Sequence, residues 1–400
     1  MSLNTLPAAG LLAVKNADVH APESLGVQHL LLGGGKILWV GAHWHDLPAD
    51  LGVPVLDLEG RRLIPGLIDG HVHITGGGGE AGFRTRVPGL SLSDCTAQGI
   101  TTVIGLLGTD DVARGPRELL ATVYGLREEG LSAFAHCGGY HVPPATLTGS
   151  VRSDLVLLEP FIGIGELAVS DHRSSQPTLD ELLRLAADAH VAGLMTGKAG
   201  IVHLHLGDGP RGLELVDQAV SQSELPARVF QPTHVNRRRA LFDEALALTG
   251  RGVPMDVTAF PVAEDEDAWS AAEAFLRWHA AGAAPERLTI SSDGGGCLPC
   301  FDEHGQVCGM DVGRPGALLA TLGELLDRGV PLATALPVFT SNVAQALRLQ
   351  AKGRIAVGLD ADLVCLDENH RALHVIAQGR IHRQDGHQRL RGTFEARDGA

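Results

Sequence analysis

The sequence predicts an α/β fold, a (β/α)8 TIM barrel with a small β-sandwich domain formed by both chain ends. Between residues 67 and 349, short β-branched or apolar runs alternate with amphipathic helical stretches, which is the order of elements in such a barrel. Both chain ends instead alternate short strands with glycine turns. No Gly-x-Gly-x-x-Gly motif follows the first central strand, which disfavours an open doubly wound sheet.

The central region supplies eight strand candidates, each followed by a helical or mixed segment, as a barrel of this kind requires. The strands are expected at residues 67–73, 101–107, 132–137, 162–169, 201–206, 228–235, 254–259 and 288–292. The clearest helical patterns lie between or after them, at residues 116–129, 179–191, 212–222, 240–248, 268–280 and 316–328.

The two chain ends share a strand-and-turn pattern without a long helical period. It is clearest in residues 10–62 and 353–386. Because chain termini commonly lie close together, we expect both ends to pair in one domain. The predicted boundaries are residues 1–66 and 350–400 for the discontinuous β-sandwich, and residues 67–349 for the barrel.

Composition narrows the function classes. The 400 residues carry a formal charge of -15 and no basic tract, so we expect neither nucleic acid nor an anionic membrane as a partner. No apolar run approaches the roughly 20 residues of a membrane span, and the first residues lack a signal-peptide pattern. Six cysteines are too few for a disulfide scaffold of this length. We therefore expect a cytoplasmic protein.

The most informative stretch is Pro65-Gly-Leu-Ile-Asp-Gly-His71-Val-His73, an apolar run that ends in two histidines. On a β-strand, residues i and i+2 point to the same side. Two neutral imidazoles on one face, at a strand end, are typical ligands of a borderline metal such as zinc. His-x-His alone is weak evidence, because most such pairs are structural.

Four more polar residues lie near the ends of predicted strands, where barrel side chains converge on the active-site face. They are Glu166, His205, His234 and Asp293. With the first histidine pair they could ligate two divalent ions, with a carboxylate bridging them. Zinc suits these ligands, although manganese, iron or cobalt would too. Such a pair would activate a bridging water as hydroxide and polarise a carbonyl, while Asp293 could act as general base and acid. This chemistry favours hydrolysis of an amide or related C–N bond.

Over nearly its whole length the chain resembles the amidohydrolase superfamily and, within it, the isoaspartyl dipeptidases. The resemblance rests on the first-strand motif and on Gly76-Gly-Gly-Gly-Glu80-Ala-Gly82, Gly105-Leu-Leu-Gly-Thr109-Asp110, Tyr140-His-Val-Pro143, Ser170-Asp-His-Arg173, Pro232-Thr-His-Val-Asn-Arg237 and Ser291-Ser-Asp-Gly294. It implies a binuclear-metal hydrolase that cleaves β-aspartyl dipeptides, and a homo-oligomer.

The resemblance also implies residue roles. His71 and His73 would bind one metal, His205 and His234 the other, and Asp293 would be both ligand and general base. Tyr140 would stabilise the oxyanion, while Glu80 would recognise the substrate's α-ammonium group. The remaining substrate contacts would come from Arg173, Arg237 and the backbone at Gly78 and Thr109. A zwitterionic β-aspartyl dipeptide, with one ammonium and two carboxylates, matches one acid and two guanidinium groups.

The chain departs from the family pattern at two positions. The family pattern has a carbamylated lysine that bridges the metals, but the alignment from Ser170-Asp-His-Arg173 puts Glu166 there. The carboxyl carbon of a glutamate lies about three bonds nearer the backbone, so Glu166 needs a closer strand, which a bulge at Gly165 could provide. Lys198, in a turn-like setting, is a poor substitute. Cys297 replaces a substrate-binding serine, so substrate preference could differ.

Structural alternatives apply to several of these residues. His203 is expected to be a buried core histidine rather than a ligand, Tyr140 could serve only in packing, and Asp293 could cap a helix. Two other functions also stay open. One is another amidohydrolase reaction, such as N-acyl-amino-acid deacylation or cyclic-amide hydrolysis, and the other is an inactive barrel that only binds a partner.

Overall fold

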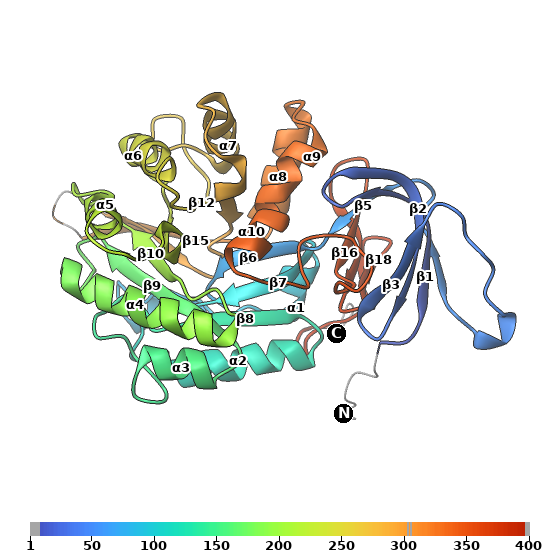
Figure 1. Cartoon of the computed structure of the whole chain (residues 1–400), viewed down its shortest axis with the longest axis horizontal. Coiled ribbons are helices and arrows are strands. Elements are labelled where there is room, and N and C mark those ends of the chain that lie inside the picture. The colour runs from blue at the N-terminus through green and yellow to red at the C-terminus, as the bar shows by residue number, and fades with distance from the viewer. Residues whose placement is uncertain (1–8, 302–303, 305, 397–400) are drawn as a thin grey trace.

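Two sheets of different character organise the chain, one built from its central region and one from its two ends (Figure 1). The computed structural model describes residues 9–301, 304 and 306–396. The central sheet lies beside most of the helices, whereas the terminal sheet lies at one side of the molecule and carries few helical residues. The chain is therefore α/β in its middle and almost all β at its ends.

The central strands are parallel and form a curled sheet. Six of them pair in the order β11-β10-β9-β8-β7-β6, and two more, β12 and β13, pair with each other. Their bounds are β6 (Leu67–Val72), β7 (Ile100–Gly105), β8 (Ser132–Cys137), β9 (Phe161–Val169), β10 (Val202–Leu206), β11 (Phe230–Thr233), β12 (Met255–Thr258) and β13 (Leu288–Ser291). All eight predicted central strands are present, each within two residues of its predicted start and within two of its predicted end.

Isolated backbone contacts, rather than a continuous ladder, join the two groups of central strands. On one side the amide of Val235 donates to the carbonyl of Asp256. On the other side Val72 forms a parallel bridge with Gly294, and the amide of His73 donates to the Gly294 carbonyl over 2.8 Å. The regular ladder is thus interrupted at both junctions, and on the second side the segment after β13 contacts the end of β6.

The helices follow the central strands. They are α1 (Leu92–Thr96), α2 (Pro116–Glu128), α3 (Val151–Leu157), α4 (Leu179–Thr196), α5 (Glu214–Ser221), α6 (Arg239–Thr249), α7 (Ala271–Ala280), α8 (Ala317–Asp327), α9 (Leu332–Ala335) and α10 (Ser341–Ala346). Short 3-10 turns occur at Ala49–Leu51, Phe83–Thr85, Ala227–Val229, Pro285–Arg287 and Leu336–Phe339. The six predicted helices are present. The short ones were not predicted, because seven residues or fewer hold too little of the 3.6-residue period.

Local sequence sets the ends of the longest helix. Thr178 and Glu181 form a capping box at the start of α4, and Gly197 ends it in the left-handed conformation at φ 75°. Such caps satisfy backbone groups that the helix leaves unpaired. The prediction ended this helix five residues early, at residue 191 instead of Thr196.

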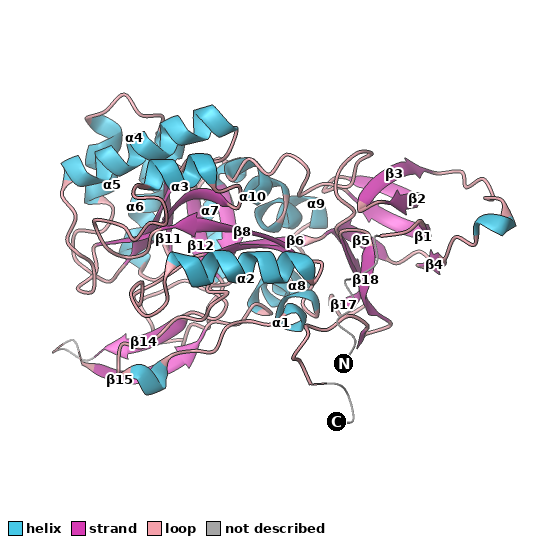
Figure 2. Cartoon of the chain, turned by 90° about the horizontal axis from the view of Figure 1, so that it is seen from below, coloured by secondary structure: helices cyan, strands magenta, loops and turns pink. Residues whose placement is uncertain are grey.

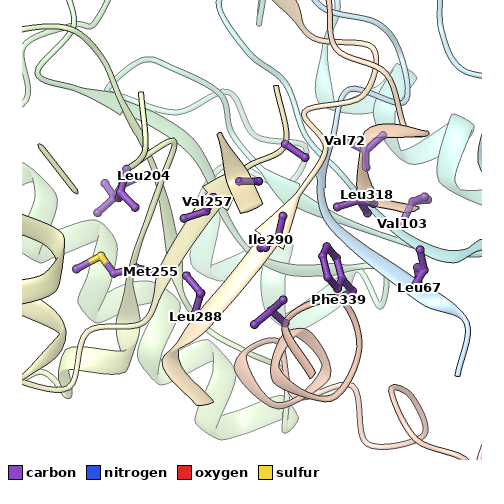
Figure 3. Close-up of a cluster of buried hydrophobic side chains, with 14 of the residues drawn as sticks. Leu67, Val72, Val103, Leu204, Met255, Val257, Leu288, Ile290, Leu318 and Phe339 are labelled. Carbon is purple, nitrogen blue, oxygen red and sulfur yellow. The ribbon is translucent and has the colours of Figure 1, made fainter. Parts of the chain in front are cut away.

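The main core lies between the central strands and their helices. Every residue of β7, β9 and β10 is buried, as expected for parallel strands covered on both faces. Figure 3 shows part of this core, with labelled side chains Leu67, Val72, Val103, Leu204, Met255, Val257, Leu288, Ile290, Leu318 and Phe339. A rigid sheet of this kind can hold polar side chains at fixed positions along its edge.

The terminal sheet joins the two chain ends by hydrogen bonds. Its strands run in the order β19-β18-β17-β16-β5-β1-β2-β3, with β4 beside β1, and the antiparallel pair β5–β16 connects the N-terminal and C-terminal parts. The bounds are β1 (Leu12–His20), β2 (Ser24–Gly33), β3 (Lys36–Gly41), β4 (Val55–Asp57), β5 (Arg62–Pro65), β16 (Leu363–Leu366), β17 (Ala372–Ala377), β18 (Arg380–Gln384) and β19 (His387–Gln388). The sandwich arrangement and the domain boundaries stay predictions, and residues 1–8 and 397–400 lie outside the described chain.

A β-hairpin that was not predicted follows the last central strand. It consists of β14 (Cys297–Phe301) and β15 (Val307–Val312), which pair antiparallel, and Figure 2 shows it extending away from the central strands. Its first residue, Cys297, is one of the predicted substrate contacts. Among the described residues, no helix combines the length and the apolar character that crossing a bilayer requires.

Candidate metal centre and substrate pocket

The six predicted metal ligands come together at the carboxyl ends of the central strands. His71 lies in β6, Glu166 in β9 and His205 in β10, while the others follow their strands directly or within two residues. All six are buried, from 0 to 7% exposed: His71, His73, Glu166, His205, His234 and Asp293. Parallel strands end at the same edge of a sheet, so residues far apart in the sequence meet there.

Glu166 lies at the centre of this cluster. Its Oε1 is 3.3 Å from His73 Nε2. Its Oε2 is 3.1 Å from His205 Nδ1 and 3.4 Å from His234 Nε2, and 3.5 Å from His71 Nε2. One carboxylate therefore has an oxygen toward each of the two predicted metal positions.

Asp293 approaches the first histidine pair from the other side. Its Oδ1 is 3.1 Å from His73 Nε2 and 3.4 Å from His71 Nε2. The backbone of Asp293 has φ 53° and that of His234 has φ 61°. Left-handed conformations are costly for residues other than glycine and tend to occur at functional sites. Both side chains are thus directed into the cluster by unusual turns at the strand ends.

The donor set fits divalent metal ions. Two overlapping triads, His71 with Glu166 and His234, and His71 with His73 and Asp293, each present ligand atoms within 4.8 Å of one another. Two ligands of one tetrahedral zinc ion lie about 3.4 Å apart, given bond lengths of about 2.1 Å, and the N···O distances above match this separation. Within the described part of the chain, His71 Nε2 and Asp293 Oδ1 are buried without a hydrogen-bond partner.

Electrostatics in the cluster suit a cation. Burial alone would raise the pKa of Glu166, but the charges on His71 and His205 hold it well below its usual range. Burial opposes a charge on His73, yet Asp293 and Glu166 raise its pKa to about 9, whereas burial lowers the pKa of His234 to about 3. The central carboxylate is therefore anionic, as a metal ligand must be.

A bulge in β9 brings Glu166 to the cluster. Along the pairing of β9 with β10, Val202 is opposite Ile164 but Leu204 is opposite Leu167, so one extra residue is inserted on β9. A β-carbon on Gly165 would lie 2.9 Å from the carbonyl oxygen of His203, so only glycine fits here. The bulge expected from the sequence is present.

Lys198 is not close to this cluster. Its ammonium donates to the carbonyl oxygens of Leu155 and Leu158 over 2.6 and 2.7 Å. These residues belong to the end of α3 and the turn after it, so Lys198 fastens that turn. It therefore offers no alternative to Glu166 as a ligand.

The cluster opens into a cavity of about 990 Å3. Every residue that was predicted to bind substrate or assist catalysis lines it, namely Gly78, Glu80, Thr109, Tyr140, Arg173, Arg237, Asp293 and Cys297. The structure thus brings all of these residues together around one space. Other lining residues, at positions 260–263 and 298–300, were not predicted.

Glu80 lines the cavity with a side chain that is only 8% exposed. Its Oε1 accepts a hydrogen bond from Thr109 Oγ1 over 3.1 Å and another from Arg173 Nη1 over 3.3 Å. Its Oε2 is buried and accepts no hydrogen bond from the side chains that the structure describes. A buried carboxylate oxygen without a donor is suited to an ammonium group of a ligand.

Tyr140 connects the pocket with the metal cluster. Its hydroxyl is 2.9 Å from Nδ1 of His205, and the side chain is buried. Burial raises the pKa of Tyr140 well above its usual value, so the phenol keeps its proton. It can therefore donate a hydrogen bond to an oxygen that carries developing negative charge.

Asp171 is a functional residue that sequence reasoning missed. It accepts hydrogen bonds from Arg173 Nε over 3.0 Å and from Arg173 Nη2 over 2.7 Å, and its Oδ2 is 3.0 Å from His205 Nε2. Burial would raise its pKa, but His205 and Arg173 hold it far below the usual value. This carboxylate links a predicted substrate-binding arginine to a predicted ligand. Its position in Ser170-Asp-His-Arg173 was the available signal.

Arg237 also lines the cavity. Its Nη1 donates to the carbonyl of Leu206 over 2.8 Å, and its Nε forms an ion pair with the exposed carboxylate of Asp208 at 2.8 Å. The guanidinium is thus oriented by backbone and carboxylate contacts and lines the pocket. Oriented guanidinium groups of this kind bind carboxylates well.

Gly78 and Cys297 lie side by side in the pocket wall. Gly78 has φ 79°, and a β-carbon there would lie 2.5 Å from the carbonyl of Thr85 and 3.4 Å from Cβ of Cys297. Burial and the charge of Glu80 raise the pKa of Cys297 to about 12. The thiol is therefore neutral, and it offers a weaker donor than the serine of the family pattern.

Comparison with known proteins identifies relatives of this chain. A model of the amidohydrolase family matches residues 152–384. The crystal structure of a β-aspartyl dipeptidase from Fervidobacterium islandicum AW-1, in complex with the dipeptide β-Asp-Leu, is 42% identical in sequence. It covers 95% of this chain and 98% of that one, with a TM-score of 0.90.

More distant relatives carry other activities. A deacetylase of Agrobacterium fabrum is 25% identical over 84% of this chain and 78% of its own length. An imidazolonepropionase of a Ruegeria species is 26% identical over 88% of this chain and 90% of its own length. The comparisons thus combine a likeness to a β-aspartyl dipeptidase with weaker likenesses to a deacetylase and an imidazolonepropionase.

Proposed function

We propose that this chain, which belongs to the amidohydrolase family, hydrolyses the β-aspartyl (isoaspartyl) peptide bond of dipeptides. Family membership makes it a hydrolase. One observation carries the proposed substrate: a buried carboxylate, Glu80, and two guanidinium groups, Arg173 and Arg237, line the same cavity as the histidine and carboxylate cluster. A β-aspartyl dipeptide presents the complementary charges, one ammonium and two carboxylates.

We infer that the eight central strands form the (β/α)8 barrel predicted from the sequence. The curl of the sheet, the Val72–Gly294 bridge between its ends and the helices along it support this inference. A barrel also explains why the cluster occupies the carboxyl ends of the strands.

In the proposed centre, His71, His73 and Asp293 would hold one divalent ion, and His205 with His234 a second, with Glu166 between them. Two such ions, for which we propose zinc, would activate a water and polarise the carbonyl that it attacks. Imidazole and carboxylate donors suit zinc. The zinc identity and the count of two are parts of the proposal.

The remaining steps belong to side chains of this protein. Glu80 would bind the α-ammonium group, while Arg173 and Arg237 would bind the two carboxylates and so position the scissile bond. Tyr140 would donate its hydroxyl proton in a hydrogen bond to the oxyanion. Asp293 would accept the proton of the attacking water and deliver it to the departing amine.

A second candidate is removal of an N-acyl group from an amino acid, which the likeness to a deacetylase favours. An N-acylated substrate has no ammonium group for Glu80 to bind. The Glu80 carboxylate therefore assists binding of a β-aspartyl dipeptide but not of an N-acylated substrate.

Hydrolysis of matched dipeptides by the metal-loaded protein tests the proposal. We expect turnover of β-Asp-Leu, none of α-Asp-Leu, and strong loss for N-acetyl-β-Asp-Leu, whose ammonium group is blocked. Absence of turnover of β-Asp-Leu by fully loaded protein would refute the proposal, and preference for the acetylated compound would favour the second candidate. The homo-oligomer, the cytoplasmic location and the absence of nucleic acid or membrane partners stay predictions.

A further inference from the structure

Polar side chains of β8, β10 and β11 lie next to the candidate ligand His71. His203, in β10 and 1% exposed, has its Nε2 2.8 Å from Nδ1 of His71. Its other ring nitrogen, Nδ1, is 3.2 Å from the side-chain oxygen of Gln231 in β11. His136, in β8, stacks on the His203 ring with 5.2 Å between centroids and 15° between planes. His203 is thus held at both nitrogens and on one face.

These contacts determine where the hydrogens lie in the two hydrogen bonds that connect Gln231, His203 and His71. An amide oxygen can only accept, so the proton of His203 is on Nδ1. A neutral imidazole carries one N–H, and therefore Nε2 of His203 accepts a hydrogen bond from Nδ1–H of His71. In the neutral form of His71 that metal binding requires, the lone pair is then on Nε2, the atom that faces Glu166 and Asp293.

The opposite orientation of the Gln231 amide would reverse the direction of both hydrogen bonds. Gln231 would donate to His203, His203 would donate to His71, and His71 Nε2 would carry a hydrogen. A protonated nitrogen cannot bind a metal. Only one direction of these two hydrogen bonds is therefore compatible with His71 as a ligand, and the orientation of the Gln231 amide sets that direction.

We infer that His203, oriented by Gln231, is a positioning residue that fixes the tautomer and ring orientation of His71 for metal binding. The inference rests on the metal centre proposed above. Ligand histidines generally donate their second N–H to a carboxylate, a backbone carbonyl or water. Here an imidazole and a side-chain amide, both buried, take that place.

Zinc affinity is the appropriate readout, because it does not depend on turnover. Apoprotein prepared with a chelator is titrated with zinc against a competing chromophoric chelator. His203→Leu removes the acceptor, and we expect a 10- to 100-fold weaker zinc affinity, the usual effect of losing such a partner. His203→Gln places an amide oxygen near the lost Nε2, and we expect it to recover most of the affinity. The cobalt-loaded protein should show an altered visible absorption spectrum for His203→Leu but not for His203→Gln.

Two further comparisons distinguish a positioning role of His203 from a role in core packing. His382→Leu removes an equally buried histidine of the terminal sheet and should leave zinc affinity unchanged. Gln231→Glu keeps an acceptor for His203, whereas the similarly shaped Gln231→Met does not, so only the Met variant should weaken zinc binding. If His203→Leu does not fold, the Gln231 pair decides.

Wild-type zinc affinity and cobalt spectrum in both His203→Leu and Gln231→Met would overturn the inference. It would also be overturned if both His203 variants lost the same zinc affinity and both Gln231 variants did so too. A wild-type protein that binds no divalent metal would instead refute the proposed function, and with it the inference. The two failures are thus distinguishable.

Discussion

Glu166 shows how a single side chain can shape a candidate metal site. The family pattern calls for a long lysine carbamate at this position, and a glutamate is shorter. Its two oxygens nevertheless lie 3.1–3.5 Å from four imidazoles. Because glutamate already carries a carboxylate, we expect assembly of the centre to need no carbon dioxide.

The first prediction concerns Glu166→Gln. The amide removes the negative charge that four histidines surround, so we expect less than the wild-type complement of metal. Loss of several kcal/mol of transition-state stabilisation corresponds to a fall in kcat/KM of more than about 100-fold. Metal analysis together with β-Asp-Leu kinetics checks it, and Glu59→Gln on the exposed surface is the control. Unchanged metal content and rate would refute the bridging role.

The second prediction concerns Asp171→Asn. The charge of Asp171 holds Arg173, whose Nη1 is already 3.3 Å from Glu80. Without that charge, Arg173 can shift further toward Glu80 and compete with the substrate ammonium group. Hydrogen bonds to charged groups contribute about 1.5–3 kcal/mol, so we expect roughly a 10- to 100-fold lower kcat/KM, mainly through KM.

The control for this variant is Asp188→Asn, which breaks an exposed ion pair with Arg152. It should leave both kinetic constants unchanged. A loss confined to kcat, with KM intact, would contradict the role assigned to Asp171 in substrate binding.

The residue types of the centre could be predicted from the sequence because each lies at or near the end of a recognisable strand. His71 and His205 needed only the positions of their strands. Asp171, His203 and Gln231 could not be assigned in the same way, because their roles depend on distances between strands. A carboxylate next to an arginine in the sequence, or a histidine one layer deeper in a strand, has no spacing that sets it apart from structural residues.

At the level of elements, β9 is the feature that adapts the site to a short side chain. Its extra residue near Gly165 interrupts the register with β10. A bulge bends the strand and redirects one side chain, here that of Glu166. The sequence indicated this feature through its unusual glycine spacing, Ile162-Gly-Ile-Gly165-Glu166.

The third prediction concerns Gly165→Ala. The new β-carbon would lie 2.9 Å from both Cβ and the carbonyl oxygen of His203. Overpacking of a tight site costs about 1–3 kcal/mol, and the displaced strand should also reduce metal content. Chemical unfolding and metal analysis measure the two effects.

Gly125→Ala in α2 provides the matched control, since nothing lies within 4 Å of its new β-carbon. We expect that variant to keep its metal and to gain up to about 1 kcal/mol through helix propensity. Normal metal content in Gly165→Ala would show that Glu166 does not depend on the bulge.

Other elements show where local pattern stops being informative. The long helices have clear periodicity and were predicted to within a few residues, apart from the end of α4. The hairpin β14–β15 was not, because Cys297-Leu-Pro-Cys300 includes a proline, which usually argues against a strand. Residues 298–300 of this hairpin line the pocket, so sequence reasoning described the candidate ligands better than this part of the pocket lining.

In the molecule as a whole, buried polar groups fasten the terminal sheet to the central one. Lys352 is buried and donates to Ser132 of β8 and to Asp362 beside β16, each over 2.5 Å. Such a buried charge is stable only when paired. The same junction also contains a histidine, His382 of β18, which is fully buried next to Gly130 after α2.

The last prediction concerns acid stability at this junction. Burial, together with the nearby charge of Arg380, lowers the pKa of His382 to about 4, while the unfolded chain has a value of about 6.5. Between these values the unfolded state binds the proton and the folded state does not. The contribution of this residue to the free energy of unfolding is therefore complete above about pH 6.5 and falls as the pH drops, by about 2 kcal/mol at pH 5.

Denaturant midpoints of the metal-free protein at pH 7.5 and pH 5.0 measure the loss. His382→Gln should reduce the difference between them, whereas His43→Gln on the exposed surface should keep the wild-type difference. An unchanged pH dependence in His382→Gln would show that this buried histidine does not link protonation to the junction between the two sheets.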